Sequence, residues 1–467
     1  MGTLSALLNL SQNSLLSSQA AIDITSNNVA NANTPGYTTE VAVWQELDTV
    51  QLTNTTRTGE GASVSAVSQR DPVLNQRLQQ QTQLASSSSA ESAALTALQS
   101  IFGLTSTSAA PISTTLGTDL NSFFSSLSAL QASPADSSVR QAVLSAAGTL
   151  ASDFNSASNQ IAQQTAGLNQ QVTGAVGQIN SLTSSIAALN LQIEATSPNA
   201  DAGTLEDQRQ QDLTQLSTFI GFDQTKTENN GLTLTTTNGA QLVSEGQSFA
   251  LGTTVANGNV NVVSAAGNDI TSGLSGGSLG GSLQARDQDL PQASSALDTL
   301  AYSVGSAVNT QNQAGIDGNG NPGGAIFILP ASAAGAASQI SLATSSPSAI
   351  AAAAVGEGSS GDTNATALSA LANMNLVGGQ SAATFYASLL TQIGTKVSSV
   401  SNENTTQQAS LTQLTTQQSA LSSVSLDQEA SNLTLYERSY DAAAKVFSIV
   451  DQLFASALNL GEETTVT

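Results

Sequence analysis

Cysteine and histidine are both absent from this chain of 467 residues. Their absence excludes disulfide bonds, zinc sites of the usual kinds, cysteine nucleophiles and Ser-His-Asp triads, and it removes the commonest general base of enzymes. Catalysis would have to depend on carboxylates, tyrosine or lysine. The composition therefore favours a protein that is not an enzyme and that holds neither a metal nor a cofactor.

Charged residues and long apolar runs are also scarce. Charged residues make up 9% of the chain, and 33 acidic against 10 basic residues leave a net charge of −23. Such a chain repels a polyanion, so we expect no nucleic acid as a partner. No apolar run approaches the roughly 18 residues that span a bilayer, and the first residues show no secretory signal. We therefore expect no insertion into a membrane.

The N-terminal segment has large apolar residues at a spacing of seven, which predicts an amphipathic helix. They are Leu8, Leu15, Ile22 and Val29. A stop signal follows: Pro35 biases Thr34 to extended geometry, and Pro35-Gly36 fills the centre of a type II turn. Asn33 suits a left-handed cap. From Tyr37 onward, alternating residues predict an extended segment to about residue 52.

The C-terminal segment mirrors this pattern. Its two sets of residues, each with a spacing of seven, are Leu426, Leu433, Tyr440, Phe447 and Phe454, and Tyr436, Ala443, Val450 and Ala457. Apolar residues continue in similar phase upstream, so one long helical region is predicted over about 384–460.

The middle of the chain contains a third apolar stripe, followed by short runs in which apolar and polar residues alternate. The stripe follows a 4-3 spacing: Leu168, Val172, Ala175, Ile179, Leu182, Ile186, Leu189 and Ile193. Extended back through Phe154, it predicts a helix of about 55 residues, roughly 80 Å long, and an elongated molecule. Asn238-Gly239 and Asn257-Gly258, between short alternating runs, predict hairpins in a small β-rich insert at about 224–265, to which residues 317–365 could add strands or loops.

The terminal stripes raise the question of what completes them. Two helices that pack only on each other bury too little apolar surface to offset the ordering of their backbones. We expect both termini to be largely disordered in the monomer and to order when the stripes also meet neighbouring subunits. The alternative is a coiled-coil hairpin that forms the stem of a monomer. Strong amide protection of residues 8–29 in dilute solution would favour the alternative.

Three segments of the sequence resemble those of a known family. "LLNLSQNSLLSSQAAIDITSNNVANANTPGYTT", near the N-terminus, is similar to the signature of bacterial flagellar axial proteins, which are the rod, hook and hook-associated proteins. "VSLDQEASNLTLYERSYDAAAKVFSIVDQLFASALNL" and "GGSLGGSLQARDQDLPQASSALDTLAYSVGSAVNTQNQAGIDGNG" resemble the C-terminal and middle regions of hook-associated members. The three matches occur in the order expected for that family.

The resemblance implies a structural subunit that forms the junction between hook and filament and templates filament assembly. It implies export through the flagellar type III secretion channel, a cytoplasmic stage before export, and a final place on the extracellular flagellum. The implied partners are other copies in a ring, the hook protein, the neighbouring junction protein, and an export chaperone on the C-terminal helix.

The fold class that follows is mainly α with a small β insert, in an elongated multi-domain protein. Paired N- and C-terminal helices (1–60 with 426–467) would form a coiled-coil-like inner domain. A long helical domain (61–223 with 266–316 and 366–425) would lie outside it. The insert (224–265, possibly with 317–365) would be outermost.

The residues expected at the assembly interface come from the two stripes and the turn. They are Leu8, Leu15, Ile22, Val29, Asn31, Thr34, Pro35, Gly36, Tyr37, Leu433, Tyr436, Tyr440, Phe447, Val450 and Phe454. For each residue of the stripes the alternative is ordinary packing inside one subunit, and for the turn it is a plain helix stop.

Other classes of protein stay open on the sequence. A secreted hydrolase could use a carboxylate pair, but Glu194, Glu206, Asp207 and Asp212 are expected to be solvated neighbours of helical stripes. A secreted adhesin would suit the Ser/Thr/Asn-rich composition but does not require matched heptads at both termini. Within the flagellar family, the alternatives are the hook and a distal rod protein.

Overall fold

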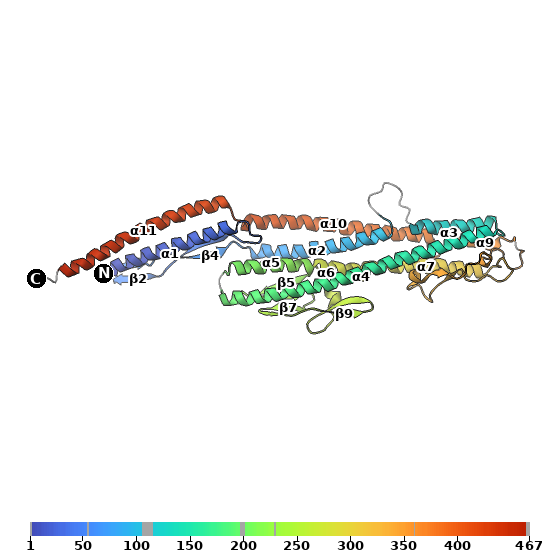
Figure 1. Ribbon diagram of the computed structural model, residues 1–467, viewed down its shortest axis with the longest axis horizontal. Helices are drawn as coiled ribbons and strands as arrows, with labels where there is room; N and C mark the ends of the chain where they lie inside the picture. The colour runs from blue at the N-terminus through green and yellow to red at the C-terminus, as the bar shows by residue number, and fades with distance from the viewer. Residues whose placement is uncertain are drawn as a thin grey trace.

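The molecule is a long rod of helices, with both chain termini at the same end (Figure 1). This computed structural model describes residues 2–53, 56–104, 115–196, 201–227, 230–358 and 360–463. The chain runs out along the rod and returns, so the first and last helices meet. The predicted class, mainly α and elongated with small sheets, is confirmed.

The narrow end of the rod is built from both ends of the chain. Helix α1 (Gly2–Asn31) lies along helix α11 (Leu426–Glu463), and a β-ribbon packs on a different side of α1 (Figure 1). In this ribbon β1 (Glu40–Glu46) pairs antiparallel with β4 (Ala62–Ser68). The hairpin of β2 (Thr49–Thr53) and β3 (Thr56–Gly59) extends it. The extended segment predicted after Tyr37 is confirmed, whereas the return strand β4 was not predicted.

The single helical region predicted over 384–460 is wrong in one place. Helix α10 (Ala382–Ser422) ends three residues before α11 begins, and Ser423 is extended, with ψ 144°. Leu414 and Leu421 are seven apart, but Leu421 and Leu426 are only five apart, so the heptad register shifts at this break. The prediction of one continuous helix overlooked this shift. The break lies at the joint between the narrow end and the rest of the rod.

The body of the rod is a bundle whose principal member is α4 (Ser137–Thr196), a helix of 60 residues and therefore about 90 Å long. Every residue of the predicted 4-3 stripe is buried along it, so this prediction is confirmed. The first half of α4 shares a core with α3 (Thr115–Ala132), α7 (Leu290–Gln313) and the ends of α2 (Pro72–Ile101) and α10. Its second half packs on α5 (Thr204–Phe219), α6 (Gly277–Gln284) and the sheet.

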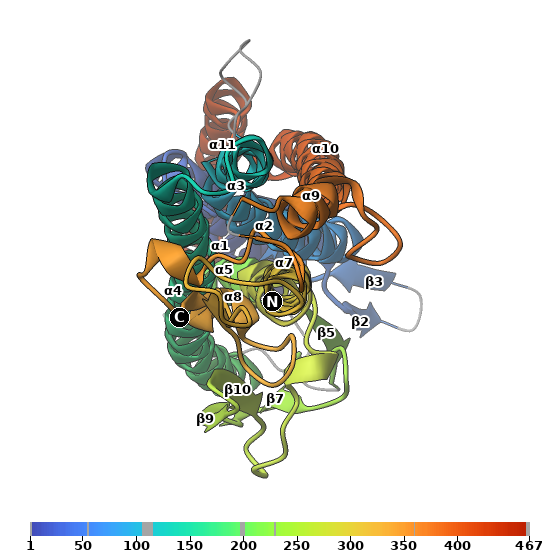
Figure 2. The same cartoon turned by 90° about the vertical axis from the view of Figure 1, so that its right-hand side faces the viewer.

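The β-rich insert lies against the second half of α4, on one side of the rod (Figure 2). A four-stranded antiparallel sheet contains β5 (Phe222–Lys226), β6 (Leu232–Thr236), β7 (Gln241–Ser244) and β8 (Gln247–Ser248), and β9 (Gly252–Ala256) and β10 (Asn259–Val263) form a separate hairpin. Both predicted turns occur: Gly239 has φ +85°, and Asn257 and Gly258 have φ +53° and +82°. These positive values explain the Asn-Gly pairs.

Residues 317–365 do not join that sheet. They form the short strands β11 (Phe327–Ile328) and β12 (Ser341–Leu342), the short helix α8 (Ala336–Gln339) and loops, and α9 (Thr363–Ala370) follows at the end of this region. Phe327 and Ile340 are buried in the core with α3, α4 and α7. This region therefore closes the far end of the rod.

One carboxylate pair in the rod gives a pH-dependent prediction. Burial, and then the hydrogen bond and charge of Asp119 on α3, raises the pKa of Asp153 on α4 to about 6. The folded chain thus binds more protons than the unfolded chain between about pH 4 and 6, so stability falls as the pH rises through this window. Asp153→Asn should flatten that dependence and raise the melting temperature at pH 8 by roughly 1–2 °C. Thermal melts from pH 4 to 8 measure this. Asp223→Asn, at an exposed carboxylate, is the control, and equal slopes in the Asp153→Asn and parent proteins would contradict the prediction.

Candidate functional site

The seam between α1 and α11 is lined by small and polar side chains on the α1 side. Five of the buried residues of α1 follow one face at spacings of three, four and seven, and Ser17 and Ile24 are buried beside them. The five are Ser11, Ser18, Ala21, Thr25 and Asn28. The Ser18 hydroxyl donates to Ser439 of α11 at 3.3 Å. Small side chains let the two backbones approach closely, which a leucine stripe on the same face would prevent.

The predicted apolar stripe of α1 lies beside this seam. Leu8, Leu15 and Ile22 are half-buried, and Val29 is 45% exposed. The hydropathy pattern therefore located the helix and its inward side, but the most deeply buried face consists of the smaller residues next to the stripe. The stripe keeps part of its apolar surface accessible.

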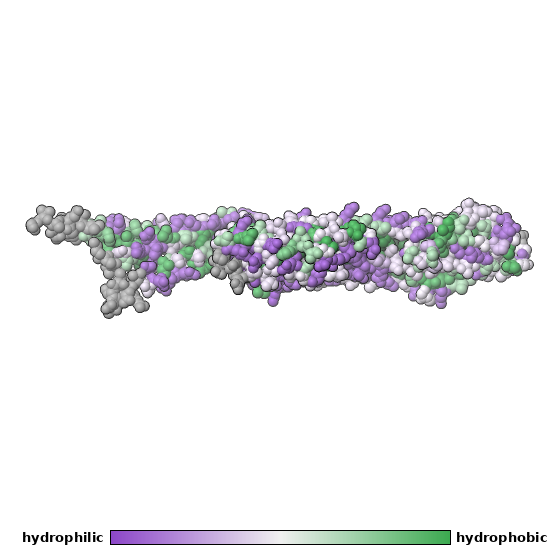
Figure 3. All heavy atoms as spheres, turned by 90° about the horizontal axis from the view of Figure 1, so that it is seen from below, coloured by the Kyte–Doolittle hydropathy of each residue, from purple (hydrophilic) through white to green (hydrophobic). Residues whose placement is uncertain are grey.

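Helix α11 is arranged in the same way. Ala443 and Val450 are buried in the seam, and Tyr436 of the same set packs on Trp44 of β1 with ring centroids 6.3 Å apart. The other predicted set lies to the side of these: Leu433, Phe447 and Phe454 are half-buried, and Tyr440 is 37% exposed. On the face of the molecule that Figure 3 shows, apolar residues also lie exposed among polar ones at this end.

The turn after α1 has the predicted type II geometry. The Tyr37 amide donates to the Thr34 carbonyl at 3.2 Å, with Pro35 and Gly36 between them and Gly36 at φ +78°. The left-handed cap predicted at Asn33 is wrong, since positive φ occurs at only three non-glycine residues of the described ranges, all beyond residue 229. Instead, the Thr34 amide donates to the Asn31 carbonyl at 2.9 Å and ends the helix.

A buried asparagine ties the turn back to α1. The side chain of Asn28 accepts from the Tyr37 hydroxyl at 2.8 Å and from the Glu40 amide at 3.0 Å, and donates to the Glu40 carbonyl at 2.7 Å. Asn28 is 1% exposed, so these bonds are shielded from water. They fix where β1 begins relative to α1. The role of Asn28 was not predicted from the sequence, and the expected role of Asn31 at an assembly interface stays a prediction.

The residues after the turn connect the narrow end to two other parts of the rod. The Thr38 amide and hydroxyl donate to the carboxylate of Asp207 on α5, at 3.0 and 2.8 Å. The Thr39 amide and hydroxyl both donate to the Ser422 carbonyl, the last residue of α10, at 3.0 Å. The turn therefore holds the narrow end against both α5 and the end of α10.

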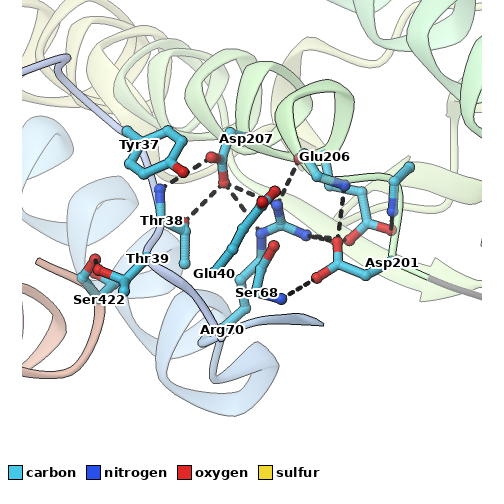
Figure 4. Close-up of polar contacts among 12 residues, drawn as sticks. Tyr37, Thr38, Thr39, Glu40, Ser68, Arg70, Asp201, Glu206, Asp207 and Ser422 are labelled. Carbon is cyan, nitrogen blue, oxygen red and sulfur yellow. Dashed lines mark hydrogen bonds and ion pairs between the residues drawn. The ribbon is translucent and has the colours of Figure 1, made fainter. Parts of the chain in front are cut away.

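Arg70, between β4 and α2, is the centre of the joint (Figure 4). Its guanidinium lies 2.7 Å from carboxylate oxygens of Asp201 and Glu206 and 3.0 Å from Asp207, and it donates to the Gly203 carbonyl at 2.6 Å. The Arg70 side chain is 12% exposed. One arginine thus engages three carboxylates at the start of α5, which joins the β-ribbon to the body of the rod.

The charges in this cluster shift the pKa values of the groups around it. Burial, followed by the charges of Asp201 and Asp207, raises the pKa of Glu40, although Arg70 opposes this. Burial and the charges of Glu40 and other carboxylates raise the pKa of Tyr37 to about 12, so its hydroxyl stays protonated and can donate to Asn28. Burial works to raise the pKa of Asp201, but hydrogen bonds from Ser68 and Gly203 and the charge of Arg70 lower it.

A groove of about 530 Å³ lies beside the joint. The turn, the start of α2, α5 and the end of α10 line it, and its apolar walls are Leu74, Leu78 and Leu421. The acids of the joint are held by Arg70 and Thr38, so the cluster has the character of a structural connection. Among the residues that the structure describes, no group of three or more metal-ligating side chains lies close enough together to hold an ion.

The sequence analysis missed the acidic half of this site. Asp207 was expected to be solvated, but it is 6% exposed, and Glu206 is half-buried. The expectation failed because their partner, Arg70, lies more than 130 positions away in the chain. The rarity of basic residues, together with the position of Arg70 just before the N-cap Asp71 of α2, was the available signal.

Comparisons with known proteins place these features in a class. A family model described as "Flagella basal body rod protein" matches residues 8–38, and one described as "Flagellar basal body rod FlgEFG protein C-terminal" matches residues 417–460. These two ranges cover the seam and the turn. Both ends of the chain are therefore similar to axial proteins of the bacterial flagellum.

The middle of the chain identifies the family more closely. The model "Flagellar hook-associated protein FlgK helical domain" matches residues 104–327. Flagellar hook-associated protein 1 of Escherichia coli (strain K12) is 30% identical over 70% of this chain and 60% of its own length, and that of Bacillus subtilis (strain 168) is 26% identical over 97% of both. The chain belongs to the FlgK family of flagellar hook-associated proteins.

Three further findings accompany this assignment. The chain spans 60% of the length of the Escherichia coli relative. The structure of the flagellar hook junction protein FlgK from Burkholderia pseudomallei shares the fold, with a TM-score of 0.66 at 22% identity over 74% of this chain and 100% of that one. No helix in the described ranges is long and apolar enough to cross a membrane.

Proposed function

We propose that this chain is a structural subunit of the junction between the hook and the filament of the flagellum, where a ring of copies templates filament assembly. One observation carries the proposal. The two ends of the chain pair into a unit that keeps large apolar side chains exposed, including Leu7, Leu16, Tyr440 and Ile449. Exposed large apolar side chains gathered at one end of a protein mark sites of protein association.

In this proposal the half-buried stripes are completed by neighbouring copies. The residues of both stripes contribute the apolar surface that they leave outside the seam. They are Leu8, Leu15, Ile22 and Val29 on α1, and Leu433, Tyr440, Phe447 and Phe454 on α11. The turn from Asn31 to Tyr37 sets the direction of this unit relative to the rod and contacts an adjacent copy. The hook protein and the next junction protein are the axial neighbours.

The route to the flagellum is part of the same proposal. The chain is exported unfolded from the cytoplasm through the flagellar type III secretion channel, and a chaperone holds the C-terminal helix before export. Absence of cysteine suits such a chain, because no disulfide has to form or break on the way. The helices of the two termini then order as copies add to the growing ring.

Removal of the last thirty residues tests the proposal. In a strain that lacks the gene for this chain, the truncated form should leave finished hooks without filaments and release flagellin into the medium, because most of α11 is lost. Electron micrographs and flagellin in the medium measure this. The full chain and a Val255→Asp variant, changed in the exposed β9–β10 hairpin, should restore filaments.

The same experiment separates the alternative classes. An adhesin or a hydrolase would keep its activity without the last thirty residues, and its loss would leave filaments in place. A hook or distal rod protein would leave no finished hook when deleted. Normal filaments in the deletion strain would overturn the proposal.

A further inference from the structure

Helix α11 has a second apolar stripe that faces away from α1. It consists of Leu435, Ala442, Val446, Ile449 and Leu453, which follow one another at spacings of seven, four, three and four. Its large members are 49–61% exposed. A helix that is apolar on two sides is usually buried on two sides, and α1 covers only one side of α11. We call this set the outer stripe.

Two cations border the outer stripe. Arg438 and Lys445 precede Ala442 and Ile449 by four residues, so they lie next to it on the helix surface. Both are exposed, and neither takes part in an ion pair with another described residue. A net charge of −23 with only 10 basic residues makes two unpaired cations beside an apolar stripe uncommon in this chain.

The β-ribbon has a matching surface. On β1 and β4 the residues that face away from α1 are Val41, Val43, Gln45, Ser63, Ser65 and Val67. Val41 pairs with Val67, and these two and Val43 are each about 40% exposed. Glu46 and Asp48, both exposed, follow at the end of β1. We call this set of six the outer ribbon face.

The charges that border the two surfaces lie at similar distances from their apolar residues. On the ribbon, Glu46 and Asp48 lie about 10–23 Å along the strand from the valines of β1 at 3.3 Å per residue. On α11, the cations lie about 6–16 Å from Ile449 at 1.5 Å per residue. Contact between valines and the Val446–Leu453 part of the stripe therefore brings cations and acids within reach of each other, which fixes direction and register.

We propose that the outer stripe of α11 docks on the outer ribbon face of a second copy of this chain. The inference rests on the proposed function and names the surfaces that join its copies. Within one molecule α11 and the β-ribbon lie on different sides of α1 (Figure 1), and the contact of Trp44 with Tyr436 between them uses residues of neither surface. Contact between different surfaces of identical copies is head-to-tail, and such contacts generate rings or helical stacks.

Disulfide trapping between two single-cysteine variants tests the contact, because the natural chain has no cysteine. Val43→Cys and Ile449→Cys proteins are mixed at high concentration in ammonium sulfate, which strengthens apolar association, and oxidised with copper phenanthroline. We expect a mixed dimer at a yield at least about tenfold above that from Val43→Cys with Asp451→Cys, an exposed position on another side of α11. Val67→Cys with Leu453→Cys is the second pair, and circular dichroism checks the folding of each variant.

The outcomes distinguish the inference from the proposed function. Assembly seen by sedimentation, without either mixed dimer, overturns the inference alone. Dimers of Ile449→Cys with itself in place of the mixed product also overturn it, since they show that stripe pairs with stripe. Failure of the parent chain to associate under any condition overturns the inference together with the proposed function.

Discussion

Replacement of Arg70 by methionine is expected to weaken the joint by about 3–5 kcal/mol, the usual cost of removing one partner of a buried ion pair. Methionine keeps most of the volume, so the loss arises from the charges of Asp201, Glu206 and Asp207, which then face one another without a cation. Amide exchange measures the opening. Protection of the Thr38 and Thr39 amides, which donate to Asp207 and the Ser422 carbonyl, should fall by two to more than three orders of magnitude.

Arg77→Met is the matched control for this change. Arg77 lies on α2, seven positions after Arg70, and is exposed, so its loss should leave the same amides unaffected. Adding Asp207→Asn to the Arg70→Met variant removes one uncompensated charge and should recover part of the protection. If the two arginine variants had equal effects, Arg70 would not hold the joint.

The parts of the fold that could be predicted are those that depend only on the spacing and type of residues close together in the sequence. The stripe of α4 is correct along its length because spacings of three and four residues place side chains on one helix face whatever surrounds them. The type II turn is correct for a similar reason, since Pro35 and Gly36 fix their own backbone angles. Both signals need no information about distant residues.

The closest contacts of the site could not be predicted in this way. On α1 the hydropathy pattern selects the leucine stripe, whereas close approach of two helices selects small residues such as Ser18 and Ala21, which carry little hydropathy signal. The heptad register shifts between Leu421 and Leu426, but the bond from Thr39 that stabilises the break after Ser422 comes from the other end of the chain. Such pairings depend on the topology of the fold, which a single sequence does not reveal.

The joint nevertheless explains why the turn has its sequence. Pro35 and Gly36 set the reversal, Thr38 reaches α5, and Thr39 reaches α10. Every one of these bonds is lost if the turn opens. The direction of the paired terminal helices relative to the rod therefore depends on a few residues, of which Gly36 is the least replaceable.

Gly36→Ala is expected to destabilise the joint by about 2–3 kcal/mol, for two separable reasons. With φ at +78°, Gly36 adopts a conformation that costs an L-residue roughly 1–2 kcal/mol. A Cβ there would also lie 2.8 and 2.9 Å from the Cγ and Cδ atoms of Gln211. The displaced Gln211 loses its bond of 2.7 Å to the Pro35 carbonyl, worth about 1 kcal/mol. Exchange of the Thr38 amide reports the change.

Two further variants separate conformational strain from the clash. Gly239 has a similar φ, +85°, but open space around its Cβ position, so Gly239→Ala should cost only about 1 kcal/mol, read from exchange of the Ala240 amide. Gln211→Ala removes the obstacle, so the double variant Gly36→Ala, Gln211→Ala should cost about 1 kcal/mol less than the sum of its parts. Strict additivity would mean that backbone strain alone makes glycine necessary. A coupling of the expected sign would show that the turn and α5 are fitted to each other. Gln211 on α5 lies where a Cβ at position 36 would be, and the same side chain donates to the turn at Pro35.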